Sequence, residues 1–519
     1  MGAPPLLVLD DVTLGFGGRP LMDHVGLAVA PGERAALVGR NGSGKSTLMK
    51  VMAGLVEPDS GGRFLHPGTR VAYMAQDPDL SAHATLGDFV AAGLAEDERF
   101  RAAIALEGLG LDGAIPVAAA SGGERRRAAL AALIAAEPDL MLLDEPTNHL
   151  DIAAISWLEA HLAASRAALV VISHDRAFLS RLTTATLWLD RGRLRRLERG
   201  FSAFEAWRDQ VHEEEARDAA RLDRLIRAES RWAVEGISAR RRRNMGRVRR
   251  LEALRAARRA AIARPGTAAM ALEAGPVSGH LVVEAEGVSK RLGARVILRD
   301  FSIRITRGER VAVVGPNGAG KTTLLGILTG RIAPDSGRVR LGTGLRPAIF
   351  DQNRAALDPG LSLWQTLTGD PELAAGGSDQ VMVRGRPRHV IGYLRDFLFD
   401  EAQARGPVSA LSGGEKARLL LARIMARESN LLILDEPTND LDLETLDLLQ
   451  ELLSDYEGTV LLVSHDRDFI DRVASTTIEL PGDGRATVYA GGFSDMQAQK
   501  AAGGGTAPAP TPARPPRPA

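Results

Sequence analysis

The chain has 519 residues, and its 45% hydrophobic and 25% charged residues are typical of globular domains, which excludes a fibrous or mostly disordered protein. Its 65 lysines and arginines balance 65 aspartates and glutamates, which argues against a uniformly basic nucleic-acid coat but leaves room for a local basic segment. The chain contains no cysteine, so disulfides and thiolate metal sites are excluded.

The amino-terminal segment, residues 1–11, has no basic flank before its short apolar run and is not typical of a signal peptide. No later run reaches the ~18–20 apolar residues that a membrane-spanning helix needs. The absence of cysteine also fits a reducing compartment. We therefore expect a cytoplasmic protein that has no membrane partner.

Strands and helices are expected to alternate along each half of the chain. Short apolar runs that end in glycine, at residues 35–39 and 311–315, predict buried strands that enter a turn. The segments that follow carry apolar residues at helical spacing. Continuous apolar runs typical of buried parallel strands lie at residues 140–144, 168–175, 431–435 and 459–466. This alternation favours an α/β fold with a parallel-sheet core in each half.

The same ordered motifs occur twice in the chain. The first copy begins with GRNGSGKST at residues 39–47 and the second with GPNGAGKTT at residues 315–323. Both copies then continue, in the same order, with a glutamine, an SGGE sequence, an apolar run followed by Asp-Glu, and a Ser-His-Asp sequence. The spacing between copies is 276 residues up to the glutamine and 291 residues from SGGE onward. The chain is therefore a duplicated domain, with 15 extra residues between these two motifs of the second copy.

The composition predicts four segments. The first α/β domain is expected at residues 5–203, a linker at 204–266, the second α/β domain at 280–496 and a tail at 497–519. The linker is rich in arginine and carries apolar stripes at helical spacing, which predicts a basic hairpin of two helices with its tip around residues 232–246. The tail is rich in proline, glycine and alanine and is expected to be disordered.

Each glycine-rich sequence fits the pattern GxxxxGK[ST] between a strand and a helix, which indicates a phosphate-binding P-loop. The backbone N–H groups and the helix N-terminus then face the phosphates. Lys45 and Lys321 are expected to reach the β- and γ-phosphates of ATP, and Ser46 and Thr322 to bind Mg²⁺. The candidate ATP-binding residues of the two loops are Gly39, Arg40, Asn41, Gly42, Ser43, Gly44, Lys45, Ser46, Thr47, Gly315, Pro316, Asn317, Gly318, Ala319, Gly320, Lys321, Thr322 and Thr323.

Carboxylates end one apolar strand of each half. Asp144 and Asp435 are expected to hold the metal, through water. The neighbouring Glu145 and Glu436 are candidates for the general base that polarises the attacking water.

Two further residue types recur beside each P-loop. His174 and His465 follow a later strand at matching offsets and are candidates for sensing the γ-phosphate. Gln76 and Gln352 each follow their P-loop lysine by 31 residues, which suits a glutamine that contacts the metal or the catalytic water.

The SGGE sequences predict a second anion cradle, since a serine and two glycines open a helix in each half. Two cradles for one nucleotide imply that it is clamped between two domains. The candidate residues are Ser121, Gly122, Gly123, Ser412, Gly413 and Gly414.

With this motif included, the order of the motifs in each half resembles that of an ATP-binding cassette (ABC) ATPase. The resemblance implies ATP hydrolysis and a head-to-tail sandwich, in which residues 121–123 face the ATP on Lys321 and residues 412–414 face the ATP on Lys45. It also places Phe16 where an aromatic side chain stacks on adenine, whereas the second half has Leu292 at that position.

Two fused cassettes with a basic helical linker resemble the ABC-F subfamily. The sequences of residues 232–255 and 381–399 are similar to the corresponding segments of its Uup branch. This resemblance implies a monomeric twin-cassette ATPase whose partner is DNA, ribosomal RNA or both. It would bind branched repair or recombination intermediates of DNA, act on the ribosome in its assembly or function, or do both. The arginines expected to contact nucleic acid are Arg240, Arg241, Arg242, Arg243, Arg247, Arg249 and Arg250. The alternatives are the ATP-hydrolysing subunit of a membrane transporter and an ATP-gated translation factor without a DNA role.

Overall fold

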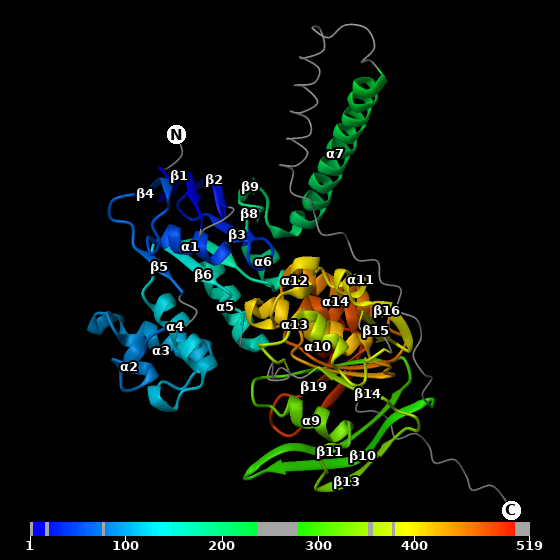
Figure 1. Cartoon of the computed structure of the whole chain (residues 1–519). Helices are drawn as coiled ribbons and strands as arrows, with labels where there is room; N and C mark the ends of the chain where they lie inside the picture. The colour runs from blue at the N-terminus through cyan, green and yellow to red at the C-terminus, as the bar shows by residue number, and fades with distance from the viewer. Residues whose placement is uncertain are drawn as a thin grey trace, which may run out of the picture.

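The computed structural model describes residues 4–15, 20–74, 78–148, 150–235, 279–350, 357–375, 379–439 and 441–503. Within these ranges, a six-stranded sheet forms the centre of each half (Figure 1). The strand orders are β5-β6-β7-β3-β8-β9 and β14-β17-β18-β12-β19-β20. Five strands of each sheet are parallel and the last is antiparallel. The predicted α/β fold with two parallel-sheet cores is confirmed.

The strands of the two central sheets occupy matching positions. In the first they are β3 (Arg34–Val38), β5 (Val71–Tyr73), β6 (Leu140–Asp144), β7 (Ala168–Ile172), β8 (Ala185–Asp190) and β9 (Arg193–Leu197). In the second they are β12 (Arg310–Val314), β14 (Pro347–Phe350), β17 (Leu431–Asp435), β18 (Thr459–Val463), β19 (Thr476–Glu479) and β20 (Thr487–Ala490).

A small antiparallel sheet and one helix cover one face of each central sheet, and their apolar side chains form a shared core. In the first half these elements are β1 (Leu7–Leu14), β2 (Met22–Val29), β4 (Ser60–Leu65) and α1 (Lys45–Ala53). In the second they are β10 (Leu281–Leu292), β11 (Arg295–Thr306), β13 (Ser336–Leu341) and α9 (Lys321–Leu328).

Helices cover the other face and form the second core of each half. In the first half they are α2 (Leu86–Ala91), α3 (Arg99–Gly108), α4 (Gly122–Ala135), α5 (Ile152–Ala164) and α6 (Arg176–Leu182). In the second they are α10 (Leu363–Thr368), α11 (Val390–Asp396), α12 (Glu401–Arg405), α13 (Gly413–Ala426), α14 (Leu443–Ser454) and α15 (Arg467–Val473).

The insertion of the second half contains a β-hairpin. Strands β15 (Gln380–Val383) and β16 (Arg386–His389) pair antiparallel. Val381 and Val383 are buried in the helical core, so the hairpin is an integral part of the second domain.

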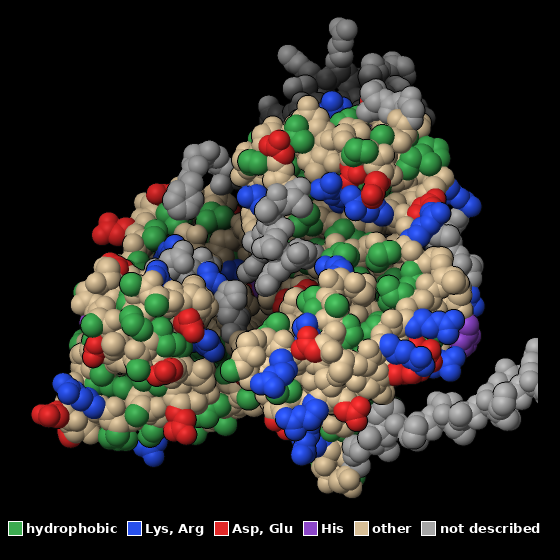
Figure 2. All heavy atoms as spheres, turned by 90° about the horizontal axis from the view of Figure 1, so that it is seen from below, with side chains coloured by type: hydrophobic (Ala, Val, Ile, Leu, Met, Phe, Trp, Pro, Cys, Tyr) green, Lys and Arg blue, Asp and Glu red, His purple; other side chains and the backbone are tan. Residues whose placement is uncertain are grey.

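At the seam between the two halves, each half packs one apolar side chain against the helical core of the other. Leu443 of the second half belongs to the helical core of the first, and Ile152 of the first packs against the helical core of the second. The two residues are equivalent, since they are 291 positions apart. On the face seen from below, acidic and basic side chains are intermixed on both halves (Figure 2).

The linker begins as a single long helix, α7 (Phe204–Glu235), which projects away from both halves (Figure 1). At 1.5 Å per residue its 32 residues span about 48 Å. The expected second helix, the hairpin tip and the arginines at 240–250 lie outside the described residues. No helix in the described part of the chain is both long and apolar enough to cross a membrane.

The expected start of the tail at residue 497 is wrong. Helix α16 (Phe493–Ala501) continues past it, because Lys500 pairs with Glu479 at 2.6 Å and the Gln499 side chain donates to the Ala490 carbonyl at 2.6 Å. Composition alone missed these contacts. Residues 504–519 lie outside the described ranges.

Two candidate ATP sites

Each P-loop lies against the end of a neighbouring strand. Gly39 has a φ of +157°, and a Cβ atom there would lie 2.4 Å from the carbonyl oxygen of Leu189. At Gly315, with a φ of +156°, the corresponding distance to the Leu480 carbonyl is 2.1 Å. Only glycine permits this approach, so the same residue is required at both positions.

The P-loop lysines are buried at the start of α1 and α9. Lys45 Nζ donates to the carbonyls of Gly39 and Arg40, at 2.7 and 3.0 Å. Lys321 Nζ donates to the Gly315 carbonyl at 3.0 Å. Burial lowers the pKa of both lysines. Neither helix has an acidic residue in its first turn, so both N-termini keep the partial positive charge that attracts phosphate.

The strand-end aspartates face the hydroxyls that follow the lysines. Thr322 Oγ1 donates to Asp435 Oδ2 at 2.9 Å. Burial raises the pKa of Asp144, although a hydrogen bond with Ser46 opposes this shift. Asp144 Oδ2 is buried without a hydrogen-bond partner. A hydroxyl beside an unsatisfied carboxylate oxygen suits a hard cation such as Mg²⁺. The described residues contain no cluster of three acidic or histidine ligands, so phosphate and water oxygens must complete such a site.

A glutamate and a histidine meet beside each P-loop. His174 Nε2 lies 3.0 Å from Glu145 Oε1, and His465 Nε2 lies 3.3 Å from Glu436 Oε1. Both glutamates have a positive φ, +52° and +49°, a strained conformation for a non-glycine residue that is frequent at functional sites. Burial lowers the pKa of both histidines to about 3 and raises the pKa of Glu436 to about 7. The imidazoles are therefore neutral at pH 7.

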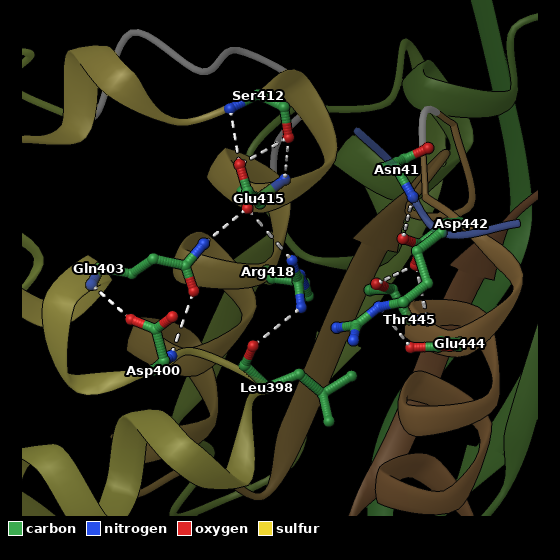
Figure 3. Close-up of polar contacts among 11 residues, drawn as sticks. Asn41, Leu398, Asp400, Gln403, Ser412, Glu415, Arg418, Asp442, Glu444 and Thr445 are labelled. Atoms are coloured by element: carbon green, nitrogen blue, oxygen red, sulfur yellow. Dashed lines mark hydrogen bonds and ion pairs between the residues drawn. The ribbon is translucent and has the colours of Figure 1, made fainter. Parts of the chain in front are cut away.

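The first P-loop lies in a cavity of about 510 Å³ that both halves line. The first half contributes Lys45, Ser46, Glu145 and His174, and the second half contributes residues 412–414. Ser412 caps helix α13, because its Oγ accepts from Glu415 N at 3.3 Å (Figure 3). The structure thus brings together the P-loop of one half and the SGG sequence of the other.

The SGG sequence that faces the second site is more exposed than its counterpart at the first. Ser121 and Gly122 are exposed, whereas the equivalent Ser412 and Gly413 are partly buried. Both sites share one contact, from a P-loop backbone N–H to an aspartate of the opposite half: Asn41 to Asp442 at 2.9 Å and Asn317 to Asp151 at 3.1 Å.

One cross-seam ion pair is specific to the first site. Arg40 pairs with Glu444 at 3.0 Å, and the position equivalent to Arg40 in the second P-loop is Pro316. A proline cannot form this pair, so the two sites differ in their charge contacts.

Sequence reasoning missed several of these residues. The aspartates Asp151 and Asp442 end the repeated sequences NHLD and NDLD, and this repetition was a signal for them. Arg126 of α4 also lines the first cavity, and its counterpart in the second half is Ala417. Only a comparison of the two copies points to Arg126. The candidates Phe16, Gln76 and Gln352 lie outside the described residues.

Comparison with known proteins identifies the family. The model of the ABC transporter family matches residues 22–148 and 298–439. The chain is 52% identical to the ATP-binding protein Uup of Caulobacter vibrioides, over 98% of this chain and 83% of the relative. The chain belongs to the ABC ATPase family, in its Uup branch. Like the other members of this family, it binds and hydrolyses ATP.

Two further proteins are similar to this ABC ATPase along most of their length. It is 40% identical to Uup of Escherichia coli, over 95% of this chain and 83% of the relative. It is 33% identical to the energy-dependent translational throttle protein EttA of Mycobacterium tuberculosis, over 92% of each chain.

Solved structures share the twin-cassette fold. The RNase-L Inhibitor aligns with a TM-score of 0.63 and 21% identity, over 95% of this chain and 93% of that one. The archaeal ribosome recycling factor aABCE1, in complex with the ribosomal stalk protein aP1, aligns with a TM-score of 0.64 and 20% identity, over 95% and 92%.

Proposed function

We propose that ATP binding closes the two cassettes, that hydrolysis reopens them, and that this cycle moves a linker bound to nucleic acid. The observation that carries the proposal is the cavity shared by Lys45 and residues 412–414. A triphosphate in this cavity contacts both cassettes, so its binding stabilises the closed arrangement and its cleavage weakens it.

In the first site, Lys45 and the backbone N–H groups of the P-loop bind the β- and γ-phosphates from one side. The N-terminus of α13, with Ser412 as its cap, faces them from the other. Arg126 adds a positive charge to the cavity wall. The equivalent groups at the second site are Lys321 and residues 121–123. This site has no counterpart of the Arg126 charge, because the equivalent residue is Ala417.

The glutamates are the general bases. Glu145 and Glu436 accept the proton of the attacking water, and the neutral imidazoles of His174 and His465 hold the glutamate oxygens and reach the γ-phosphate. The strained backbone at each glutamate fixes its carboxylate at the strand end, beside the P-loop lysine.

Four residues are placed to hold Mg²⁺: Ser46 and Asp144 in the first site, and Thr322 and Asp435 in the second. Mg²⁺ held there would supply positive charge against the negative charge that develops on the phosphate oxygens. Gln76 and Gln352 are proposed as additional contacts on the basis of their spacing alone.

The partner of the linker is nucleic acid. The tip sequence contains Arg240 to Arg243 without an intervening acid, and each arginine that contacts a phosphate releases a counterion. The names of two similar proteins refer to translation and to ribosome recycling, which favours ribosomal RNA. The likeness to the Uup branch leaves branched DNA as the second candidate.

The test uses the double variant Glu145→Gln/Glu436→Gln, which retains ATP and keeps the cassettes closed. Nucleic acid cross-linked to the segment 240–250 in cells is recovered and sequenced. Ribosomal RNA or DNA junctions, enriched over a variant with Arg240 to Arg243 changed to Ser, support the proposal and select between the partners. Equal recovery from both proteins contradicts it.

A further inference from the structure

Three parts of the molecule meet at one buried arginine. Arg176 is 5% exposed and is the first residue of α6. Its guanidinium forms ion pairs with Glu205, in the first turn of linker helix α7, at 2.7 Å and with Asp447 of helix α14 in the second cassette. Arg208, in the next turn of α7, lies 3.5 Å from the other oxygen of Asp447. Asp447 therefore contacts both the first cassette and the linker.

Helix α7 is otherwise fixed to the first cassette. Phe204 and Trp207 pack edge-on against Trp188 of β8, with ring centroids 5.8 and 5.6 Å apart. Two turns further along α7, Glu215 pairs with Arg191 and Arg195 of the first cassette, at 2.8 and 2.6 Å. Aromatic packing and paired arginines make the base of α7 a rigid extension of the first cassette. If the cassettes separate as in the proposed function, α7 is therefore expected to move with the first one and to leave Asp447.

Arg176 directly follows the loop that carries His174. Ser173 Oγ lies 2.9 Å from Thr147 Oγ1 and accepts from Asp175 N at 3.1 Å. Asp175 in turn caps α6 by accepting from Phe178 N at 2.8 Å. His174 therefore lies between Ser173, which is bonded within the first cassette, and Arg176, which is paired with the second cassette.

Helix α14 also contacts the first P-loop. Asp442 caps this helix and Glu444 lies in its first turn, and these residues bind Asn41 and Arg40 of the P-loop (Figure 3). One helix of the second cassette therefore contacts the first ATP site at one end and, one turn later, the base of the linker.

The second site has a different arrangement. Its equivalent arginine, Arg467, pairs with Glu159 of α5 and lies 3.6 Å from Asp175. Both partners are in the first cassette and neither is in α7. The second half has one extra residue before this point, since RGFSAF at residues 199–204 matches GGFSDM at residues 491–496. The position equivalent to Glu205 is therefore Gln497, whose neutral amide cannot form an ion pair.

We propose that Asp447 is a positioning residue that holds Arg176 and the base of α7 together when the first ATP site is closed. ATP at the first site, rather than at the second, then sets the direction of the linker helix. Because such coupling is reciprocal, any ligand that fixes the linker changes the ATP affinity of the first site. This proposal concerns ATP and the protein alone, so it is tested without nucleic acid and can fail or succeed independently of the linker's partner.

The test uses the natural absence of cysteine. Spin labels are attached at Ala220→Cys on α7 and Glu457→Cys on the second cassette, both exposed, in the Glu145→Gln/Glu436→Gln background. Mg–ATP is expected to narrow the distribution of distances between the labels. Asp447→Asn is expected to abolish this narrowing and Asp447→Glu to restore it. The matched control Glu451→Gln, an exposed position on the same helix, is expected to behave as the parent.

Two further measurements separate positioning from folding. Lys45→Ala is expected to abolish the narrowing and Lys321→Ala to leave it. In the hydrolysing protein, Asp447→Asn is expected to raise the KM for ATP about 5-fold or more, the lower end of usual coupling energies, with kcat and the unfolding temperature nearly unchanged. The proposal is overturned if Mg–ATP narrows the distance distribution of Asp447→Asn as much as that of the parent. It is also overturned if Lys321→Ala and Lys45→Ala change this narrowing equally.

Discussion

Asp442 of the second cassette accepts a hydrogen bond from the backbone N–H of Asn41 in the first P-loop, at 2.9 Å. Asp442 is 4% exposed, and burial alone raises the pKa of a carboxylate. Hydrogen bonds from Thr445 and Asn41 outweigh burial and lower the pKa of Asp442 to about 2. A permanent negative charge of one cassette is therefore held against the phosphate-binding loop of the other.

Replacing this charge is expected to weaken closure at the first site. Asp442→Asn keeps a side chain that caps α14 about as well as aspartate does, so the fold is retained. The lost charge-assisted hydrogen bond is worth about 1.5–3 kcal/mol, and we expect roughly 10- to 100-fold weaker ATP binding at the first site. Titration of the Glu145→Gln/Glu436→Gln protein with a fluorescent ATP analogue measures this. The matched variant Asp151→Asn should affect only the second site, and equal effects of the two variants on both sites would contradict the assignment.

The two glutamates are expected to carry the chemistry. Changing both Glu145 and Glu436 to Gln removes the proposed general bases but keeps the shape of the side chains. Loss of a general base typically costs 10²- to 10⁴-fold in rate, whereas ATP binding should persist. Phosphate release and nucleotide binding are measured on the same preparation. Normal phosphate release by the double variant would show that another group activates the water.

Glu436 makes the stability of the protein depend on pH. Its pKa is raised by burial to about 7 in the folded state, against about 4.3 in an unfolded chain. Folding therefore becomes less favourable as pH rises from ~4.3 to about 7, because in this range the carboxyl ionises in the unfolded chain while burial keeps it protonated in the folded state. Glu436→Gln should raise the unfolding temperature relative to the parent at pH 8 and change it little at pH 5. Calorimetry without nucleotide measures both, and an equal shift at the two pH values would argue against ionisation as the cause.

The fold could be predicted because its signals are local. A strand that ends in glycine before a lysine-headed helix occurs twice, and both copies form the predicted P-loops at Gly39 and Gly315. The juxtaposition of Ser412 with Lys45 came from the resemblance to ABC ATPases, since no local pattern reveals which surfaces face one another.

Contacts that depend on docking could not be predicted in this way. The Arg40–Glu444 pair joins residues from different cassettes. The sequence predicts Arg40 as part of a P-loop, but no pattern in it marks Glu444 as its partner. The extension of α16 to Ala501 depends similarly on Glu479, which is distant in the chain. Partners of this kind became evident only in the folded structure.

The arginine that lines the first cavity gives the sharpest contrast between the two sites. Arg126→Ala makes this position of the first half resemble Ala417 of the second. We expect weaker ATP binding at the first site, because a cation near the phosphates is lost from a partly enclosed cavity where water screens charge poorly. Competition of ATP with a fluorescent analogue, in a Lys321→Ala background that silences the second site, measures the change.

The neighbouring Arg125 is the control for this variant. It is exposed, lies on the same helix and donates to the Val117 carbonyl at 3.2 Å, so Arg125→Ala changes the net charge of α4 by the same amount without altering the cavity. If Arg125→Ala and Arg126→Ala weaken ATP binding equally, the effect arises from overall charge and Arg126 has no specific role. A loss confined to Arg126→Ala, and diminished at high salt because the nucleotide's charge is then screened, places its guanidinium near the phosphates.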